Sequence, residues 1–304
     1  MDNSIKFGQL VFKRNGVLAS GILGVTGHSM IKVSENGAGG ITCKSISKNE
    51  RKGHPTPVIQ GYQCGIINAV GLSSTGVKNT NNELSIVRKK SDALIIASVF
   101  GGTDVEFVET IQELDLELID AIELNISCPN VHDEFGLPFA SSPESAYKLV
   151  KLVRPSTKLP LIVKLSPNFP NIGKIAKACE DAGADGITAI NTVGPGMLID
   201  INTFEPKLSN KTGGVSGPAI LPIAIRIVYD IYKSVKIPII GMGGITTLDD
   251  ALQMIIAGAT LYGVGTGILY NGIDIFNKIN SGIDDYLAEK KLSYNEIIGM
   301  AHRI

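Results

Sequence analysis

Short apolar runs that recur along the whole chain constrain its fold more than any other feature. Each run is bounded by Gly, Asn, Asp or Pro, as in LIVKLS and GITAIN. Near-continuous apolar strands of this kind are typical of a parallel sheet that is buried on both faces. The candidate strands occupy residues 17–20, 40–44, 93–98, 121–127, 161–166, 186–191, 237–242 and 261–265.

Helical patterns lie between several of these runs, at residues 142–154, 170–184 and 248–259. Alternating strands and helices with eight candidate strands predict an α/β fold, a (β/α)₈ TIM barrel. A doubly wound open sheet is the main alternative, but no G-x-G-x-x-G turn follows an early strand. Segment 45–92 is rich in Ser, Asn, Lys and Gly, and segment 192–218 shows little helical periodicity. We expect both to be long inserted loops with functional roles.

Composition narrows the class of protein further. The 28 Lys and Arg residues balance 29 Asp and Glu residues, so no excess charge attracts nucleic acid or anionic lipid. Hydrophobic residues make up 44% of the chain and charged residues 19%, as in a core-rich globular protein. With no linker, repeat or low-complexity segment, we expect residues 1–304 to form a single domain.

Cellular location and metal binding are constrained by what the sequence lacks. No stretch reaches the ~18 uninterrupted apolar residues of a membrane span. Residues 13–24 resemble a signal peptide, but glycines interrupt them and we expect a strand with its loop. Four cysteines without a C-x-x-C pair fit a reducing cytoplasm, and we expect neither a metal site nor a cysteine-bound iron–sulfur cluster in this chain.

Polar residues cluster where the predicted strands end, which is where barrels build active sites. Lys44 and Lys164 close two strands, where a lysine can simply extend its head group into solvent. Two lysines at one barrel mouth instead favour stabilisation of negative charge on a bound ring. Gly243-Gly244 and Gly265-Thr266 follow the last two strands, where backbone N–H groups can bind a phosphate.

The string NISCPN at residues 125–130 is the most specific of these strand ends. A cysteine is usually an inert buried hydrophobe, and we expect this of Cys43, Cys64 and Cys179. Cys128 has polar neighbours and is a candidate general base. Amide side chains suit a flat heterocycle with alternating N–H and C=O groups, and the candidates are Asn68, Asn125, Asn130 and Asn191.

An ordered series of motifs resembles class 1 dihydroorotate dehydrogenase, a flavin barrel enzyme of pyrimidine synthesis. The series comprises GGITCKSIS near residue 40, NAVGL at 68–72, NISCPN, VKLSP at 163–167, INTVGPG at 190–196, GGVSGPA at 213–219 and IIGMGGI at 239–245. The resemblance implies oxidation of dihydroorotate to orotate. It also implies that Cys128 takes the C5 proton, that the C6 hydride passes to flavin N5, and that Lys164 stabilises the resulting charge.

The resemblance also implies the ligand contacts. Those to FMN come from Ser20, Lys44, Ser45, Asn125, Lys164, Ile190, Gly217, Gly243, Gly244, Gly265 and Thr266. Those to the substrate come from Lys44, Asn68, Ala69, Val70, Gly71, Leu72, Asn125, Asn130, Asn191 and Thr192.

Within class 1 the chain is most similar to the catalytic subunit of the two-subunit, NAD-linked branch (class 1B). That branch implies a homodimer core with a separate FAD and iron–sulfur subunit. Three segments depart from the family pattern: Ser98 replaces an asparagine, SSTG follows NAVGL, and the segment VHDEFGLPFA is unusually acidic. These departures leave the physiological electron acceptor open, whether NAD through a partner, fumarate or another oxidant.

Two alternative functions remain open on the sequence alone. One is a related flavin barrel, such as the pyrimidine-reducing domain of dihydropyrimidine dehydrogenase. The other is a barrel that binds a phosphorylated ligand without turnover, which leaves Cys128 and both lysines unexplained.

Overall fold

Eight parallel strands close into a barrel in the computed structural model, which describes residues 4–126 and 141–303. Around the barrel the strands follow the order of the chain, and the last strand pairs with the first. This closure confirms the predicted TIM barrel and excludes the open sheet. The barrel strands are β3 (Gly16–Leu18), β4 (Gly40–Thr42), β7 (Leu94–Val99), β8 (Ala121–Asn125), β9 (Leu161–Leu165), β10 (Gly186–Ala189), β13 (Ile239–Met242) and β14 (Leu261–Val264).

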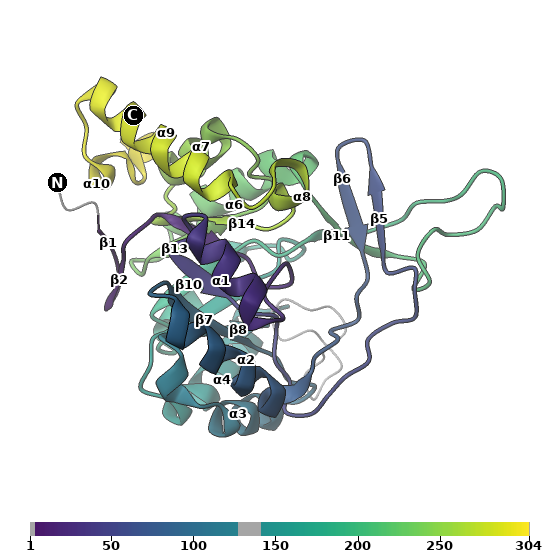
Figure 1. Cartoon of the computed structure of the whole chain (residues 1–304). Coiled ribbons are helices and arrows are strands. Elements are labelled where there is room, and N and C mark those ends of the chain that lie inside the picture. Colours follow the sequence, from purple (N-terminus) through teal and green to yellow (C-terminus); the bar gives the residue numbers. More distant parts are fainter. Residues whose placement is uncertain (1–3, 127–140, 304) are drawn as a thin grey trace.

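Helices surround the barrel on its outside (Figure 1). Several begin with a Ser or Thr whose side chain caps the first turn; Thr247 and Asp250, for example, form a capping box at α7. No described helix is long and apolar enough to cross a bilayer. The helices are α1 (Gly27–Glu35), α2 (Gly76–Lys90), α3 (Asp104–Glu113), α4 (Pro143–Val153), α5 (Ile172–Asp181), α6 (Leu221–Tyr232), α7 (Leu248–Ile256), α8 (Gly267–Asn271), α9 (Ile275–Lys290) and α10 (Tyr294–Ile297), with 3₁₀ turns at Leu116–Leu118, Arg154–Ser156, Pro218–Ile220 and Met300–His302.

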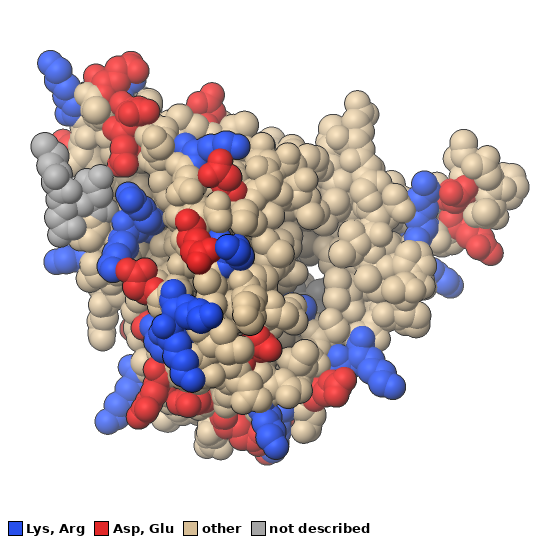
Figure 2. All heavy atoms as spheres, in the orientation of Figure 1, with Lys and Arg blue, Asp and Glu red and all other residues tan. Residues whose placement is uncertain are grey.

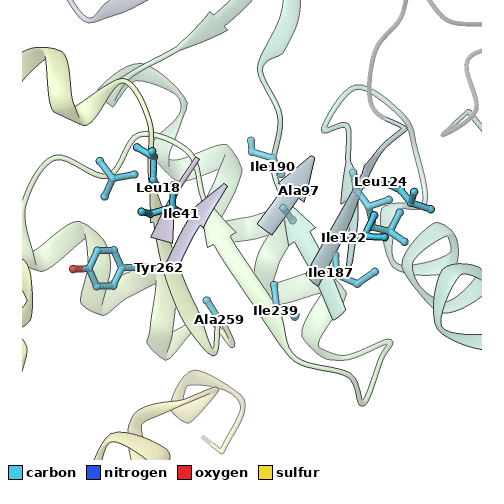
Figure 3. Packing of buried hydrophobic residues seen from close by; sticks show 14 of the residues in the cluster. Leu18, Ile41, Ala97, Ile122, Leu124, Ile187, Ile190, Ile239, Ala259 and Tyr262 are labelled. Carbon is cyan, nitrogen blue, oxygen red and sulfur yellow. The ribbon is translucent and has the colours of Figure 1, made fainter. Parts of the chain in front are cut away.

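Both faces of the barrel strands are buried, which explains why their sequences are apolar almost without interruption. Outward residues such as Leu18, Ile122 and Ile239 belong to the large cluster beneath the helices, part of which is drawn in Figure 3. Inward residues such as Ile96 and Ile162 form a second cluster inside the barrel.

A β-hairpin covers the N-terminal end of the barrel. Strands β1 (Ile5–Phe7) and β2 (Leu10–Phe12) pair antiparallel, and Phe7 and Phe12 join the inner cluster with their rings edge to face at 6.0 Å. Glycine makes room for them: a Cβ atom on Gly40 would lie 2.6 Å from the Phe12 ring, and one on Gly186 2.5 Å from the Phe7 ring.

Residues 45–92 and 192–218 are long insertions into the barrel, as predicted, but they are not loops throughout. These segments contain helix α2 and four strands, which form an antiparallel sheet in the order β11-β12-β6-β5. The strands are short and glycine-rich, and β6 pairs with a strand almost 150 residues away, so local periodicity could not reveal them. They are β5 (Ile59–Tyr62), β6 (Gly65–Asn68), β11 (Val193–Gly196) and β12 (Gly213–Ser216).

This added sheet, together with the arm formed by residues 197–212, projects away from the barrel (Figure 1). Because β11 begins four residues after β10 ends, the sheet starts at the carboxyl end of the barrel. It therefore lies at the end where the predicted site residues are found.

The hairpin gives a direct test of the fold. Phe12→Ala removes a fully buried ring, and we expect the free energy of unfolding to fall by about 3–5 kcal/mol. The neighbouring Val11 is 52% exposed, so Val11→Ala should change it by less than about 0.5 kcal/mol. Urea unfolding followed by circular dichroism measures both changes. Equal losses of unfolding free energy in the two variants would contradict the conclusion that the hairpin covers the end of the barrel.

Candidate active site

The carboxyl ends of the barrel strands bring most of the predicted site residues to one rim. Ser20 follows β3, Lys44 and Ser45 follow β4, Asn125 ends β8, and Lys164 lies near the end of β9. Strand direction alone explains this convergence, since all eight strands run parallel. Cys128 and Asn130 lie outside the described residues, so their predicted roles stay predictions.

Just below this rim, the inside of the barrel changes from apolar to polar. Ile96, Ala121 and Ile162 belong to the inner apolar cluster. Side chains alternate along a strand, so residues two positions further on also face inward. Those residues are Ser98, Glu123 and Lys164, and all three are buried.

Lys164 reaches across the mouth of the barrel. Its Nζ atom donates a hydrogen bond of 3.1 Å to Ser20 Oγ, and its side chain is almost fully buried. Strands β9 and β3 are four positions apart in the ring of eight, so this bond joins opposite walls. A positive charge is thereby held at the centre of the rim.

A second set of polar side chains forms a hydrogen-bond chain along neighbouring strands. Asn125 Nδ2 donates to Ser45 Oγ at 3.1 Å, the Ser45 and Ser98 hydroxyls lie 3.1 Å apart, and Ser98 Oγ donates to Glu123 Oε1 at 3.0 Å. Sequence analysis predicted Ser45 and Asn125, but it assigned no role to Ser98 or Glu123. The signals in the sequence were the departure of Ser98 from the family pattern and the charged residue inside the apolar run AIELNIS.

Glycines after β13 and β14 leave backbone N–H groups available at the adjacent part of the rim. Within the described part of the chain, the N–H groups of Gly243, Gly244, Gly265 and Thr266 donate no hydrogen bond. Gly243 and Gly244 have positive φ angles of 129° and 82°, a conformation that favours glycine. Thr266 Oγ1 donates to Ser216 Oγ at 2.8 Å, so β12, which the sequence did not predict, also contacts this region.

The space available for a side chain differs among these glycines. A Cβ atom on Gly244 would lie 2.8 Å from backbone and side-chain atoms of Leu221, where α6 begins. On Gly265 it would make only an ordinary contact, 3.4 Å from the Ala19 Cβ. Gly265 therefore has open space beside it, whereas Gly244 allows helix α6 to approach.

The predicted substrate segment 68–72 is held by the added sheet. Asn68 Nδ2 donates to the Gly214 carbonyl at 3.3 Å, and the Val70 carbonyl accepts from His54 N–H at 3.1 Å. Across the rim, Asn191 Oδ1 accepts from the Thr192 N–H at 2.8 Å. The remaining predicted positions also lie here: Ile190 follows β10, and Gly217 follows β12 with a φ of 102°.

A cavity of about 360 Å³ adjoins Lys44 and Ser45. Of the charged residues with described positions, Lys44, Arg51, Lys52 and Glu50 line it. Hydroxyl groups of residues 73–75 complete the wall. This excess of positive charge is suited to a small anion.

The cysteines with described positions fall into two groups. Cys43 and Cys179 are buried as predicted, and burial raises the pKa of both thiols to about 12, so they are inert near neutral pH. Cys64 is exposed at the turn between β5 and β6, which corrects the prediction that it is buried. The sequence did not reveal this hairpin and hence the position of its turn.

The fold is an α/β barrel whose carboxyl rim carries the buried Lys164 and the cavity lined by Lys44, Arg51 and Lys52. The sequence profile of the family described as "Dihydroorotate dehydrogenase" matches residues 4–287. The chain belongs to the dihydroorotate dehydrogenase family, whose members are flavin-dependent oxidoreductases, and the resemblance seen in the sequence is confirmed.

Similar curated proteins carry the name "Dihydroorotate dehydrogenase B (NAD(+)), catalytic subunit". The protein of Methanocaldococcus jannaschii is 42% identical over 294 residues, covering 96% of this chain and 95% of its own. That of Thermococcus kodakarensis is 43% identical over 300 residues, covering 98% and 97%. That of Pyrococcus furiosus is 41% identical over 305 residues and covers both chains fully. These matches favour neither alternative function left open by the sequence.

Proposed function

We propose that this chain is the FMN-binding catalytic subunit of a two-subunit dihydroorotate dehydrogenase, which oxidises (S)-dihydroorotate to orotate in cytoplasmic pyrimidine synthesis. The observation that carries the proposal is the buried Lys164 ammonium at the centre of the rim of a barrel of this family. The exposed Cys64 thiol and the other unpaired cysteines support a reducing compartment.

The residues at the rim fit FMN. The N–H groups of Gly243, Gly244, Gly265 and Thr266, which donate to no described residue, suit its phosphate, as helix and loop N–H groups suit phosphates elsewhere. The buried Lys164 ammonium would face the electron-rich flavin ring. We assign ring and ribityl contacts to Ser20, Lys44, Ser45, Asn125, Lys164, Ile190 and Gly217. When bound, FMN supplies the hydride acceptor.

The substrate is a small anionic ring, and the rim has matching groups. The cationic cavity beside Lys44 supports recognition of its carboxylate. Amides hold the ring in a fixed orientation, which aligns the bonds that break. We assign these contacts to Lys44, Asn68, Ala69, Val70, Gly71, Leu72, Asn125, Asn130, Asn191 and Thr192.

Two side chains act on the reaction itself. The Cys128 thiolate takes the proton from C5 of dihydroorotate as general base. The Lys164 ammonium stabilises negative charge that develops at the rim, because it is held in a buried site of low dielectric. Both remain proposals for this chain, as does each ligand contact above.

Gly265 tests the phosphate position. Gly265→Val should yield folded protein without FMN, because the side chain has room beside Ala19 yet covers the N–H groups. Gly61→Val is the matched control, since Gly61 lies in β5 with open space around it and should keep its flavin. Flavin absorbance per chain measures both. A full complement of FMN in Gly265→Val rules out this phosphate position.

Cys128 tests the base. Cys128→Ala should retain FMN and bind orotate, while anaerobic flavin bleaching by dihydroorotate slows by about 10²–10⁴-fold. Cys64→Ala, which removes the exposed thiol of the hairpin turn, should bleach at the wild-type rate. Stopped-flow absorbance gives the rates. Bleaching of Cys128→Ala at the wild-type rate excludes Cys128 as the base.

We further propose that the chain assembles as a homodimer that binds a separate FAD and iron–sulfur subunit. The β5–β6 hairpin contains no charged residue, and in Figure 2 it is tan, whereas the neighbouring arm carries charges of both signs. The tip of the neighbouring arm exposes Ile201 by 82% and Phe204 by 84%. Large exposed apolar groups mark association surfaces, and two-fold contacts between identical chains are the commonest kind.

The electron acceptor is tested with the isolated chain. It should elute as a dimer and reduce an artificial dye with dihydroorotate, yet turn over negligibly with NAD and poorly with fumarate. The reason is that its four cysteines lack iron–sulfur spacing and its sequence lacks a dinucleotide fingerprint. Rapid NAD reduction by this chain alone would overturn the need for a partner subunit, and rapid fumarate reduction would assign the chain to the single-subunit branch.

A further inference from the structure

We propose that Glu123 is a positioning residue that makes Asn125 present its carbonyl oxygen to the substrate ring. The inference rests on the proposed contact between Asn125 and dihydroorotate. We infer that the rim prefers a substrate with a ring N–H group, and that Glu123 sets this preference without contacting the ligand.

Glu123 lies beneath the rim, on the same strand and the same inward face as Asn125. It is fully buried, and within the described structure it forms no ion pair; its one side-chain hydrogen bond there is the 3.0 Å bond from Ser98. A buried carboxylate is costly unless it is bound by donors. In its ionised form the Oε1 atom acts only as an acceptor and takes the Ser98 hydroxyl proton, so this end of the hydrogen-bond chain has a fixed direction.

Because each hydroxyl group has one proton, the donor and the acceptor of every other hydrogen bond in the chain follow from this end. The single hydroxyl proton of Ser98 is committed to Glu123, so Ser98 Oγ must accept from Ser45. The Ser45 proton is then committed as well, so Ser45 Oγ must accept from the Asn125 amide at 3.1 Å. With its nitrogen turned toward Ser45, Asn125 directs its carbonyl oxygen to the opposite side.

This orientation of Asn125 would make the site selective for a ligand ring that carries an N–H group at this position. A carbonyl oxygen accepts a hydrogen bond from a ring N–H group, and an amide nitrogen in its place would repel that group. Sites built to bind an N–H group reject analogues that lack it, because a buried acceptor is left unpaired. Hydrogen-bond chains of this kind act as a unit, so a change at Glu123 alters the orientation of Asn125.

To keep this direction, the residue at position 98 must accept one hydrogen bond and donate another. Serine does so with one hydroxyl group, which accepts from Ser45 and donates to Glu123. Asparagine can do the same with its carbonyl and amide groups, whereas alanine cannot. Ser98→Asn should therefore retain the relay and Ser98→Ala should interrupt it.

The experiment measures orotate dissociation constants by flavin absorbance, together with FMN content and the KM and kcat of dye-linked turnover. Glu123→Gln should weaken orotate binding at least tenfold, because the amide that it introduces can donate to Ser98 and reverse the chain. The KM should rise by a similar factor, with kcat changing far less and FMN content unchanged. The preference of the wild-type protein for orotate over its ring N-methyl derivatives should also decline in this variant.

Thr42→Val is the control for disturbance of the same layer, since the Thr42 hydroxyl is buried without a hydrogen-bond partner among the described residues. It should bind orotate with wild-type affinity. If Glu123→Gln does not fold, the pair at position 98 decides: weak binding by Ser98→Ala with recovery in Ser98→Asn supports the inference. Wild-type affinity in Glu123→Gln or in Ser98→Ala overturns it. Failure of the wild-type chain to bind orotate at all overturns the proposed function, and this inference with it.

Discussion

Closure of eight parallel strands into one barrel is the constraint on which the rest of the structure depends. Closure buries both faces of every strand and ends all strands at one rim. A residue's environment then follows from its position along its strand. Ile96 and Ile162 lie in the apolar layer, and two residues further on Ser98 and Lys164 lie in the polar one. The same alternation therefore builds the core and positions the site.

Two opposite charges occupy this polar layer without neutralising each other. Lys164 is held by the Ser20 hydroxyl and Glu123 by the Ser98 hydroxyl. A buried ammonium with a neutral partner is incompletely compensated, because removing it from water is costly. A ligand that develops negative charge supplies the missing compensation, and low dielectric strengthens that attraction. The Glu123 carboxylate, by contrast, accepts a hydrogen bond from a neutral side chain of the protein and so orients neutral groups.

The sequence predicted those parts of the fold and site that depend on local pattern. All eight barrel strands were found where apolar runs predicted them, and the glycines at 243 and 265 lie at the rim. The added sheet was missed because β6 and β12, which join its two hairpins, pair across almost 150 residues of sequence. The role of Glu123 was missed for a related reason. Its charge is visible inside an apolar run, but its bond to Ser98 depends on which strands are neighbours.

The added sheet connects two parts of the rim, the proposed substrate segment and the proposed phosphate position. Its two hairpins arise after β4 and β10, four positions apart in the ring of strands, and they meet through pairs such as Gly214 with Asn68. At the other end of this pairing, Ser216 accepts a hydrogen bond from Thr266. A slip of one residue between β6 and β12 would turn every side chain of the slipped strand to the other face. The register of this pairing therefore fixes how the segment that begins at Asn68 lies relative to Ser216 and its partner Thr266, and so relative to the proposed phosphate position.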